Sequence, residues 1–448
     1  MTTEQAVTAT ADHPAPLSAR SAGLRYGTLF GPAVFGVTAA GVALPDVAAS
    51  LDATPSAAAW VLTAHALALG VGTALFGRLA DSRGARASLL LGSLVLAIGT
   101  VICLLAPGIG TLVAGRFVLA AGSGAMTSGA LALSASAAPA DRARVLGGLG
   151  ATMALFSAGA TLAGGVFTQW VTWRVTLVLP ALSLLAVPLC LRAAARRGSG
   201  RPLDLPGALL LTVAATSFLL LIQAYALGLS APLVIAFAAA LPVSAVGLLL
   251  RVRAVQEAFV PRRLVMDGVL LRAAVTGIGV YAGLFAAMYA VPQILVGEHG
   301  WSVLAVGGWL LPGAVVGAVL SRTAGRLTGG RGGSLLLSGI TAAMAVVLAL
   351  SVALSHPAPL VIGASLGFAA FAVTQIVTTA LMSARIEPAL RGGAMGLLNL
   401  TFFVGGGVGS ATAGALAKSM SLTGLLIVVA AFPLVGALTA PTLGRRDA

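Results

Sequence analysis

Apolar runs of about 20 residues follow one another along the chain from Tyr26 onward, separated by short polar connections. A helix of that length crosses ~30 Å of hydrocarbon. The runs lack the strict alternation of barrel strands, and backbone groups in lipid must be hydrogen-bonded within the chain, so the pattern predicts helices. We expect fourteen, at residues 25–44, 57–78, 87–106, 110–136, 143–167, 173–192, 206–226, 231–250, 269–293, 302–323, 333–354, 358–382, 392–416 and 421–440.

Composition supports this pattern. Of 448 residues, 58% are hydrophobic and 8% are charged, and the mean hydropathy is +1.03, which excludes a soluble globular protein. The net charge of +14 lies in short clusters between apolar runs, without interleaved aromatic residues, so it does not indicate a nucleic-acid partner. Cys103 and Cys190 lie in apolar runs at no metal-ligand or disulfide spacing. We therefore expect an all-α integral membrane protein with no metal or cofactor.

Basic residues gather in alternate connections, for example Arg78, Arg83 and Arg86 in one and Arg142 and Arg144 in another. Because Lys and Arg are retained on the cytoplasmic side, this predicts cytoplasmic termini, an even number of helices and a multi-pass protein of the plasma (inner) membrane. Residues 1–22 are polar and lack the plan of a secretory signal, so we expect a disordered cytoplasmic tail there and a second tail at 441–448.

The chain repeats itself. Residues Gly77 to Arg86, GRLADSRGAR, have a weaker copy at Gly325 to Gly333, GRLTGGRGG. Later in each half, Pro139, Ala140 and Arg142 align with Pro388, Ala389 and Arg391. This self-similarity predicts two related six-helix halves, at 23–192 and 269–440, as in secondary transporters. The remaining segment, 193–268, then forms an inserted helix pair with basic linkers.

Several short motifs accompany this plan: Gly77 and Leu79 with Asp81, Arg83, Gly84 and Arg86, then Leu44-Pro45-Asp46 closing the first helix, Trp60-Val61, Arg116 with Gly122 and Gly124, Gly164-Gly165, and Trp173-Arg174. With them the chain resembles the major facilitator superfamily, and within it the 14-helix drug:proton antiporter branch. The resemblance implies that superfamily's fold and transport by alternating access.

The resemblance implies a conformational latch in the first repeat, formed by Gly77, Asp81, Arg83, Gly84 and Arg86. Glycines allow a tight turn, and the charges can hold the cytoplasmic helix ends together in one state. Alternatively, the arginines only determine topology. The second copy has Gly329 in place of Asp81, so any latch is asymmetric.

Two ionisable residues, His65 and Arg116, lie deep in predicted helices, and such residues are often functional. Many antiporters of the branch carry an acid where this chain has Gly36. Arg116 therefore pairs with an anionic substrate or is a structural tie to backbone carbonyls. His65 couples transport to protons or is satisfied by a helical carbonyl.

A polar and aromatic set is expected to line the central cavity. Tyr281, Phe285, Met288 and Tyr289 share one helix face, and Gln375, Asn399 and Phe402 lie at depth on later helices. Such a cavity suits bulky amphipathic molecules, whereas ordinary helix packing explains the aromatic residues equally well.

Three functions follow. The first is export of hydrophobic or amphipathic small molecules, such as drugs or secondary metabolites, by alternating access, with proton coupling left open. The second is a carrier or facilitator of an organic anion paired to Arg116, without proton antiport. The third, a membrane enzyme, lacks a visible catalytic constellation in the helices. The partners expected are a small-molecule substrate, membrane lipids and, in the coupled case, protons.

Overall fold

The computed structural model describes residues 18–53, 55–195, 197–225, 227–256, 258–327, 331–354, 356–417 and 420–444. These residues form α-helices and short 3₁₀ helices joined by turns. Within the described ranges, fourteen segments are long and apolar enough to cross a membrane, which confirms the predicted number. Most of the predicted tail at 1–22 and the last four residues, 445–448, lie outside the described residues.

The first half contains α1 to α8, two of whose spans include a 3₁₀ turn. Its elements are α1 Ala19–Phe30, η1 Gly31–Gly36, α2 Thr38–Ser50, α3 Pro55–Arg83, α4 Ala85–Leu105, α5 Ile109–Ala135, α6 Pro139–Trp170, α7 Trp173–Val178, η2 Leu179–Leu182 and α8 Ser183–Leu191.

The inserted pair is α9 Leu205–Ile222 and α10 Ala231–Ala254, followed by the short α11 Arg262–Val265. The second half contains α12 Gly268–Gly297, α13 Val303–Leu327, α14 Gly332–Leu350, α15 Pro357–Arg385, η3 Pro388–Leu390, α16 Arg391–Leu416, α17 Leu422–Val429, α18 Ala431–Thr439 and η4 Ala440–Gly444.

The first and sixth spans are interrupted, whereas the sequence predicted continuous helices. Pro32 is the second residue of η1, and Pro180 is the second residue of η2. Proline has no backbone N–H to donate, so it interrupts the α-helical hydrogen bonds and the chain forms a tighter turn there. The first helix also begins at Ala19, inside the predicted tail, and α2 runs through Asp46 to Ser50, beyond the predicted end at residue 44. The motif Leu44-Pro45-Asp46 therefore does not close the helix.

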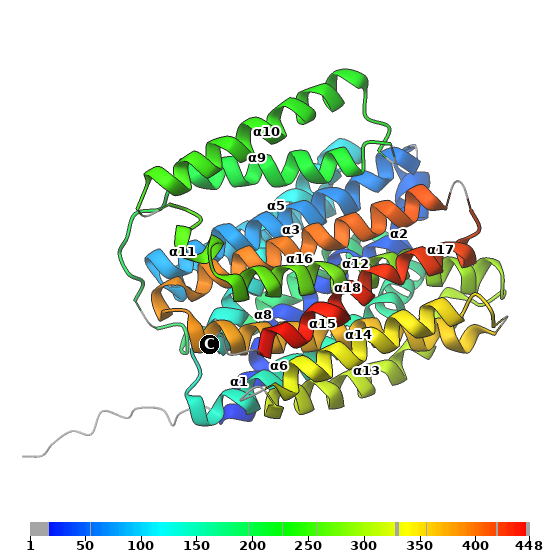
Figure 1. Cartoon of the computed structure of the whole chain (residues 1–448). Coiled ribbons are helices and arrows are strands. Elements are labelled where there is room, and N and C mark those ends of the chain that lie inside the picture. The colour runs from blue at the N-terminus through cyan, green and yellow to red at the C-terminus, as the bar shows by residue number, and fades with distance from the viewer. Residues whose placement is uncertain are drawn as a thin grey trace, which may run out of the picture.

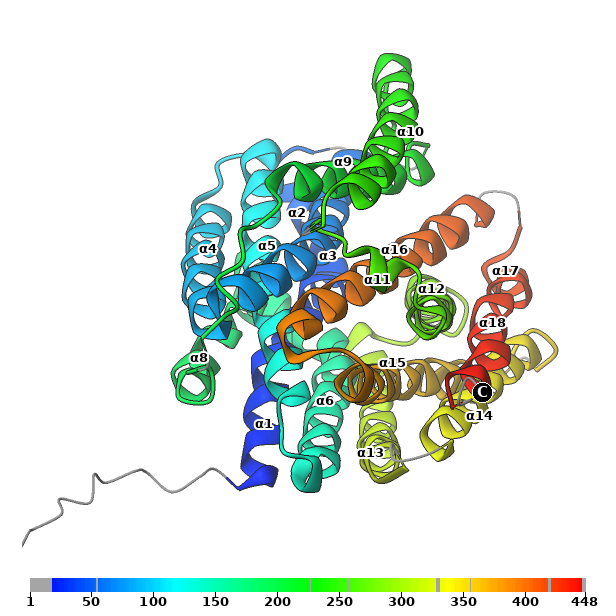
Figure 2. The same cartoon turned by 60° about the vertical axis from the view of Figure 1, so that its left-hand side comes forward.

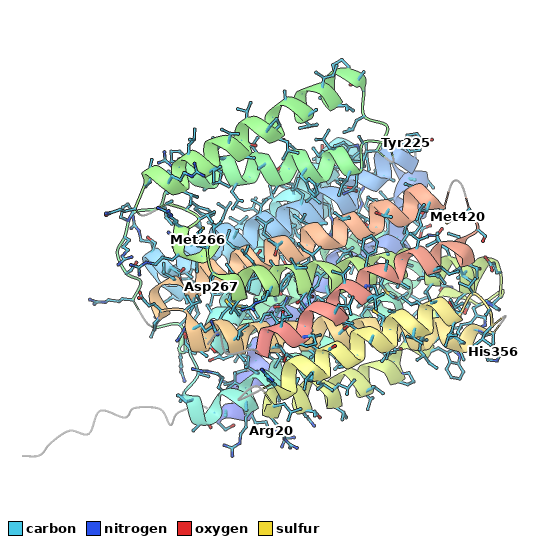
Figure 3. All side chains as sticks on the ribbon, in the orientation of Figure 1. Arg20, Tyr225, Met266, Asp267, His356 and Met420 are labelled. Carbon is cyan, nitrogen blue, oxygen red and sulfur yellow. The ribbon has the colours of Figure 1, made fainter. Side chains whose placement is uncertain are left out.

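The helices run in alternate directions along one bundle (Figure 1). Arg20, Met266 and Asp267 lie at one end, and Tyr225, His356 and Met420 lie at the other (Figure 3). We call the first of these the Asp267 end. Seen from a second direction, α1 to α8 form one group and α12 to α18 another, with α9 and α10 outside both (Figure 2).

Glycines set how closely the two halves approach. Along one seam, α3 packs on α16, where a Cβ added at Gly70 would lie 3.1 Å from the Leu400 side chain. Along the other, α13 packs on α6, where a Cβ added at Gly307 would lie 2.8 Å from Leu162. Small residues of this kind let membrane helices pack backbone to backbone.

Candidate functional site

At one end of the α3–α16 seam, the carboxylate of Asp81 caps the N-terminus of α16. Its Oδ1 accepts the backbone N–H of Gly392 at 2.8 Å, and its Oδ2 accepts that of Gly393 at 2.6 Å. No residue of α16's own N-terminal turn provides a side-chain cap, so Asp81 supplies it from the other half. A carboxylate is favoured there by the free N–H groups and the helix dipole. We call this contact the Asp81 latch.

The structure places the predicted latch residues unequally. The Gly77 backbone lies against Gly392 with no room for a Cβ, and Gly84 turns the chain between α3 and α4 with φ 95°. Arg83 and Arg86 are exposed and form no ion pair with the described residues. The cation beside Asp81 is Arg78, buried, with its Nη1 at 4.0 Å from Asp81 Oδ2. Which arginine lies beside Asp81 depends on how α3 is rotated about its axis against α16. The sequence alone does not show this rotation.

The second seam repeats the packing without the acid. A Cβ added at Gly325 of α13 would lie 2.7 Å from the carbonyl oxygen of Ala143 in α6. The N-terminus of α6 has no side-chain cap from Ala138, its N-cap residue, and the acid in its first turn, Asp141, pairs with exposed Arg144 at 3.3 Å. Gly329, which matches Asp81 in the second copy of the repeat, lies outside the described residues.

Deeper in the first half, Arg116 of α5 is wholly buried and bonded to three backbone carbonyls. Its Nε donates to Val61 at 3.4 Å, its Nη1 to Leu177 at 2.5 Å, and its Nη2 to Gly36. Leu177 and Gly36 lie at the interruptions of the sixth and first spans, where the break leaves carbonyl groups to be satisfied. This geometry favours the structural tie over a bond to an anionic substrate.

His65 of α3 fills the space beside Gly36. A Cβ at Gly36 would overlap the imidazole ring, so an acid at this position has no room unless His65 moves. His65 is wholly buried, and neither ring nitrogen has a hydrogen-bond partner among the described residues. The imidazole therefore occupies the space in which the resemblance led us to expect an acidic side chain, but it does not supply a negative charge.

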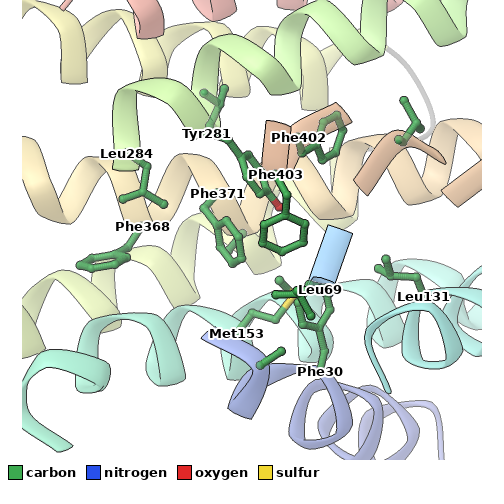
Figure 4. Packing of buried hydrophobic residues seen from close by; sticks show 14 of the residues in the cluster. Phe30, Leu69, Leu131, Met153, Tyr281, Leu284, Phe368, Phe371, Phe402 and Phe403 are labelled. Atoms are coloured by element: carbon green, nitrogen blue, oxygen red, sulfur yellow. The ribbon is translucent and has the colours of Figure 1, made fainter. Parts of the chain in front are cut away.

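An aromatic cluster lies between the halves (Figure 4). The Tyr281 ring packs on Phe371 and Phe402, each with centroids 5.1 Å away, and on Phe403 edge-on at 5.7 Å. Phe371 in turn contacts Phe30 of the first half at 6.4 Å. The Phe285 ring stacks on the Tyr281 ring with centroids 6.3 Å apart. The structure thus brings Tyr281, Phe285 and Phe402 together, while their expected place in a cavity lining stays a prediction.

A series of hydrogen bonds made by amide side chains runs through this cluster. Asn399 Nδ2 donates to the Met395 carbonyl at 2.9 Å, which leaves Asn399 Oδ1 to accept from Gln375 Nε2 at 2.7 Å. Gln375 Nε2 also donates to the Tyr281 hydroxyl. The amide of Gln375 is thereby oriented, and its Oε1 is buried without a partner among the described residues. Tyr281 keeps its own hydroxyl proton to donate.

Two predicted cavity residues lie apart from the cluster. Met288 and Tyr289 are half-buried further along α12, and the Tyr289 ring lies beside Gly414 of α16. In the described part of the chain, no group of three His, Cys, Asp or Glu residues could hold a metal ion.

Comparison with known proteins gives a consistent result. The family described as "Major Facilitator Superfamily" matches residues 26–410. The puromycin resistance protein pur8 of Streptomyces alboniger is 33% identical over 178 residues, which cover 39% of this chain and 35% of that protein. The cephamycin export protein CmcT of Amycolatopsis lactamdurans is 34% identical over 193 residues, 41% of this chain and 39% of that protein. The matched region thus spans little more than a third of each of these relatives.

A longer match is the multidrug resistance protein Stp of Mycobacterium tuberculosis, 28% identical over 402 residues, which cover 85% of this chain and 73% of that protein. Among solved structures, the human organic anion transporter MFSD10 (TETRAN) superimposes with a TM-score of 0.67 at 14% identity, covering 94% of this chain and 99% of that one. At that identity the likeness shows the fold alone.

Proposed function

Because the chain belongs to the major facilitator superfamily, a family of membrane transporters, we propose that it exports hydrophobic or amphipathic small molecules by alternating access. The observation that carries this proposal is the aromatic cluster around Tyr281, Gln375 and Asn399, which lies between the two halves and contains no charged side chain among those described. The export and resistance proteins among the relatives support the direction and the kind of substrate.

The unused hydrogen-bonding groups define the substrate further. Gln375 Oε1 is an acceptor and the Tyr281 hydroxyl a donor, both surrounded by aromatic rings. A complementary molecule presents a donor and an acceptor close together on an aromatic or apolar frame, as an aromatic amide or a hydroxylated ring does. Since the three polar side chains are wholly buried here, a substrate reaches them only when the halves separate.

The Asp81 latch provides the conformational element. It joins the halves in the state seen here, and alternating access requires that this contact break and re-form. From the basic connections we propose that the Asp267 end faces the cytoplasm of the cell, so that this state is closed to the cytoplasm. Proton coupling stays part of the proposal to be tested, because Gly36 and His65 occupy the place of the expected acid.

Transport by purified protein in proteoliposomes tests the proposal. The probes are tritiated puromycin, tritiated benzoate as an organic anion, and ethidium, each with and without an imposed pH gradient. Export predicts saturable transport of puromycin that falls about five- to tenfold in Gln375→Leu, because the bound amide loses a buried hydrogen bond. Gln293→Leu, an exposed glutamine on α12, is the control and should transport normally.

Three results decide between the alternatives. Transport of benzoate alone, abolished in folded Arg116→Gln, supports the anion carrier instead of the exporter. Absence of transport of all three probes by folded protein contradicts the export proposal. An effect of the pH gradient that disappears in His65→Gln assigns the coupling to His65.

A further inference from the structure

The inserted helix pair is attached to the same seam that carries the Asp81 latch. Helix α9 packs against both α3 and α16. Far from the latch, Thr63 Oγ1 of α3 donates to Gln223 Oε1 at 2.8 Å, and a Cβ added at Gly407 of α16 would lie 2.6 Å from Leu219 of α9. One helix of the insertion therefore touches both sides of a seam that alternating access must open.

The linker that precedes α9 binds the backbone of the latch itself. Ser199 N–H donates to the Asp81 carbonyl at 2.8 Å, and Gly200 N–H donates to the Ser82 carbonyl at 2.9 Å. In the opposite direction, the Ser82 hydroxyl donates a hydrogen bond to the Arg201 carbonyl at 2.5 Å. A Cβ at Gly198 would collide with the backbone of Ser82 and Gly84, so the two segments are in direct backbone contact.

The linker that follows α10 reaches the cation of the latch. Arg78 Nη2 donates to the Ala258 carbonyl at 3.4 Å, and its guanidinium lies 6.0 Å from the centre of the Phe259 ring. Arg78 is therefore positioned by the insertion on one side and by Asp81 on the other.

Asp204 joins the two linkers. Its Oδ1 accepts the N–H of Gly207 at 3.0 Å and the Nε–H of Arg251 at 2.6 Å, and its Oδ2 accepts the N–H of Phe259 at 2.9 Å. Partial burial opposes ionisation, but these donors outweigh it and hold the pKa of this carboxyl below its ordinary value of 3.8. Asp204 is thus a charged junction between the start of α9, the end of α10 and the segment that contacts Arg78.

We propose that the inserted pair is a working part of the Asp81 latch: with Asp204 positioning its linkers, it holds α3 against α16 in the closed state and is displaced when that seam opens. Three contacts carry the proposal, namely Ser199 and Gly200 on the latch backbone, Ala258 on Arg78, and α9 across the seam. It rests on the proposed latch and assigns a role in the transport cycle to the two helices that the six-helix repeat does not require.

The test measures the separation of the halves in the full-length transporter in lipid nanodiscs. Spin labels are placed at Arg144→Cys and Glu387→Cys, one exposed residue in each half near the helix ends that form the two seams, with Cys103 and Cys190 replaced by alanine. Asp204→Asn removes the charge from the junction, and Gly198→Ala separates the linker from Ser82. Each has a matched control: Asp267→Asn removes a similar cap from α12, and Gly268→Ala adds a methyl group where nothing lies within 4 Å.

We expect Asp204→Asn and Gly198→Ala to raise the ratio of separated to closed molecules about three- to tenfold, in the direction of Asp81→Asn, with neither control changing it. Thermal unfolding should match the controls, because packing within each half is untouched. If Asp81→Asn shifts the distances and both insertion variants behave as their controls, the insertion is a passive attachment and the inference is overturned, while the latch stands. If Asp81→Asn shifts nothing, the latch fails and the inference fails with it. Gly198→Ala decides the result if Asp204→Asn does not fold.

Discussion

The two halves of the bundle share a backbone plan but differ in what they bury. Gly77 and Gly325 occupy matching positions at the two seams, each against the N-terminal turns of a helix from the other half. Among the described residues of the two halves, the buried His, Arg and Asp side chains, which are His65, Arg78, Asp81 and Arg116, all belong to the first. The second half buries the neutral Tyr281, Gln375 and Asn399 instead.

On the function proposed above, this difference would separate the tasks of the two halves. Charged side chains in the first half bond to the interrupted first and sixth spans and to the start of α16, whereas the neutral polar groups of the second half are the ones we propose to bind substrate. The closing contact is one-sided, since Asp81 caps α16 and no described acid caps α6. The inserted pair lies on that same seam.

The largest expected effect concerns the buried charge of the first half. Arg116→Gln leaves carbonyls at both interrupted spans without a donor, and we expect it to lower the unfolding free energy by about 3–5 kcal/mol. Thermal unfolding in detergent, followed by size-exclusion chromatography, measures this. Gln375→Leu is the counterpart in the second half and should lose only about 1 kcal/mol. Equal losses would remove the contrast between the halves.

The next effect concerns the two seams. Asp81→Asn weakens the cap on α16 by roughly 2 kcal/mol, because the charge leaves a helix N-terminus, and transport should fall about tenfold or more at near-normal expression. Asp141→Asn, which alters the exposed acid at the start of α6, should change transport less than about twofold. Full activity in Asp81→Asn would mean that the loop only sets topology.

The packing of the seams should, by contrast, be equivalent. Gly77→Ala and Gly325→Ala each place a methyl group against backbone of the opposite half, and each should lower stability by about 1–3 kcal/mol. Parallel thermal-unfolding measurements compare them. A loss in Gly77→Ala alone would show that the seams differ in packing as well as in charge.

The smallest expected effect is on transport by variants of the two loop arginines, Arg83 and Arg86. Arg83→Gln and Arg86→Gln remove exposed charges and should change transport by less than about twofold once insertion into the membrane is normal. Arg78→Gln, beside Asp81, should reduce transport more. A large loss in Arg83→Gln would place the latch cation at the residue first expected from the sequence.

Much of the fold was predictable because the length of each apolar run fixes a membrane-spanning helix, whereas the division into two six-helix halves and an inserted pair stays a prediction from the repeat. The site was predictable in part. Tyr281, Phe285, Gln375, Asn399 and Phe402 contact one another in one cluster, while their role in a substrate cavity stays a prediction. Met288 and Tyr289 share the helix face but lie further along it.

The remaining features depend on contacts between distant segments. The choice of Arg78 over Arg83 follows from how α3 is rotated against α16. Two of the three carbonyls that bind Arg116, those of Gly36 and Leu177, lie where the chain is interrupted near Pro32 and Pro180. The fit of His65 beside Gly36 depends on the approach of two helices. No local pattern in the sequence predicts any of these three contacts.

Amide hydrogen exchange at the N-terminus of α16 tests the one-sided latch most directly. Gly392 and Gly393 donate to Asp81, whereas the first turn of α6 has no such acceptor in the described structure. Mass spectrometry on the transporter in nanodiscs should show faster exchange of a peptide containing Gly392 and Gly393 in Asp81→Asn, with the peptide at Pro139–Val145 unchanged. Equal exchange of the α16 peptide in wild type and Asp81→Asn would contradict the account, as would equal acceleration at both helix starts.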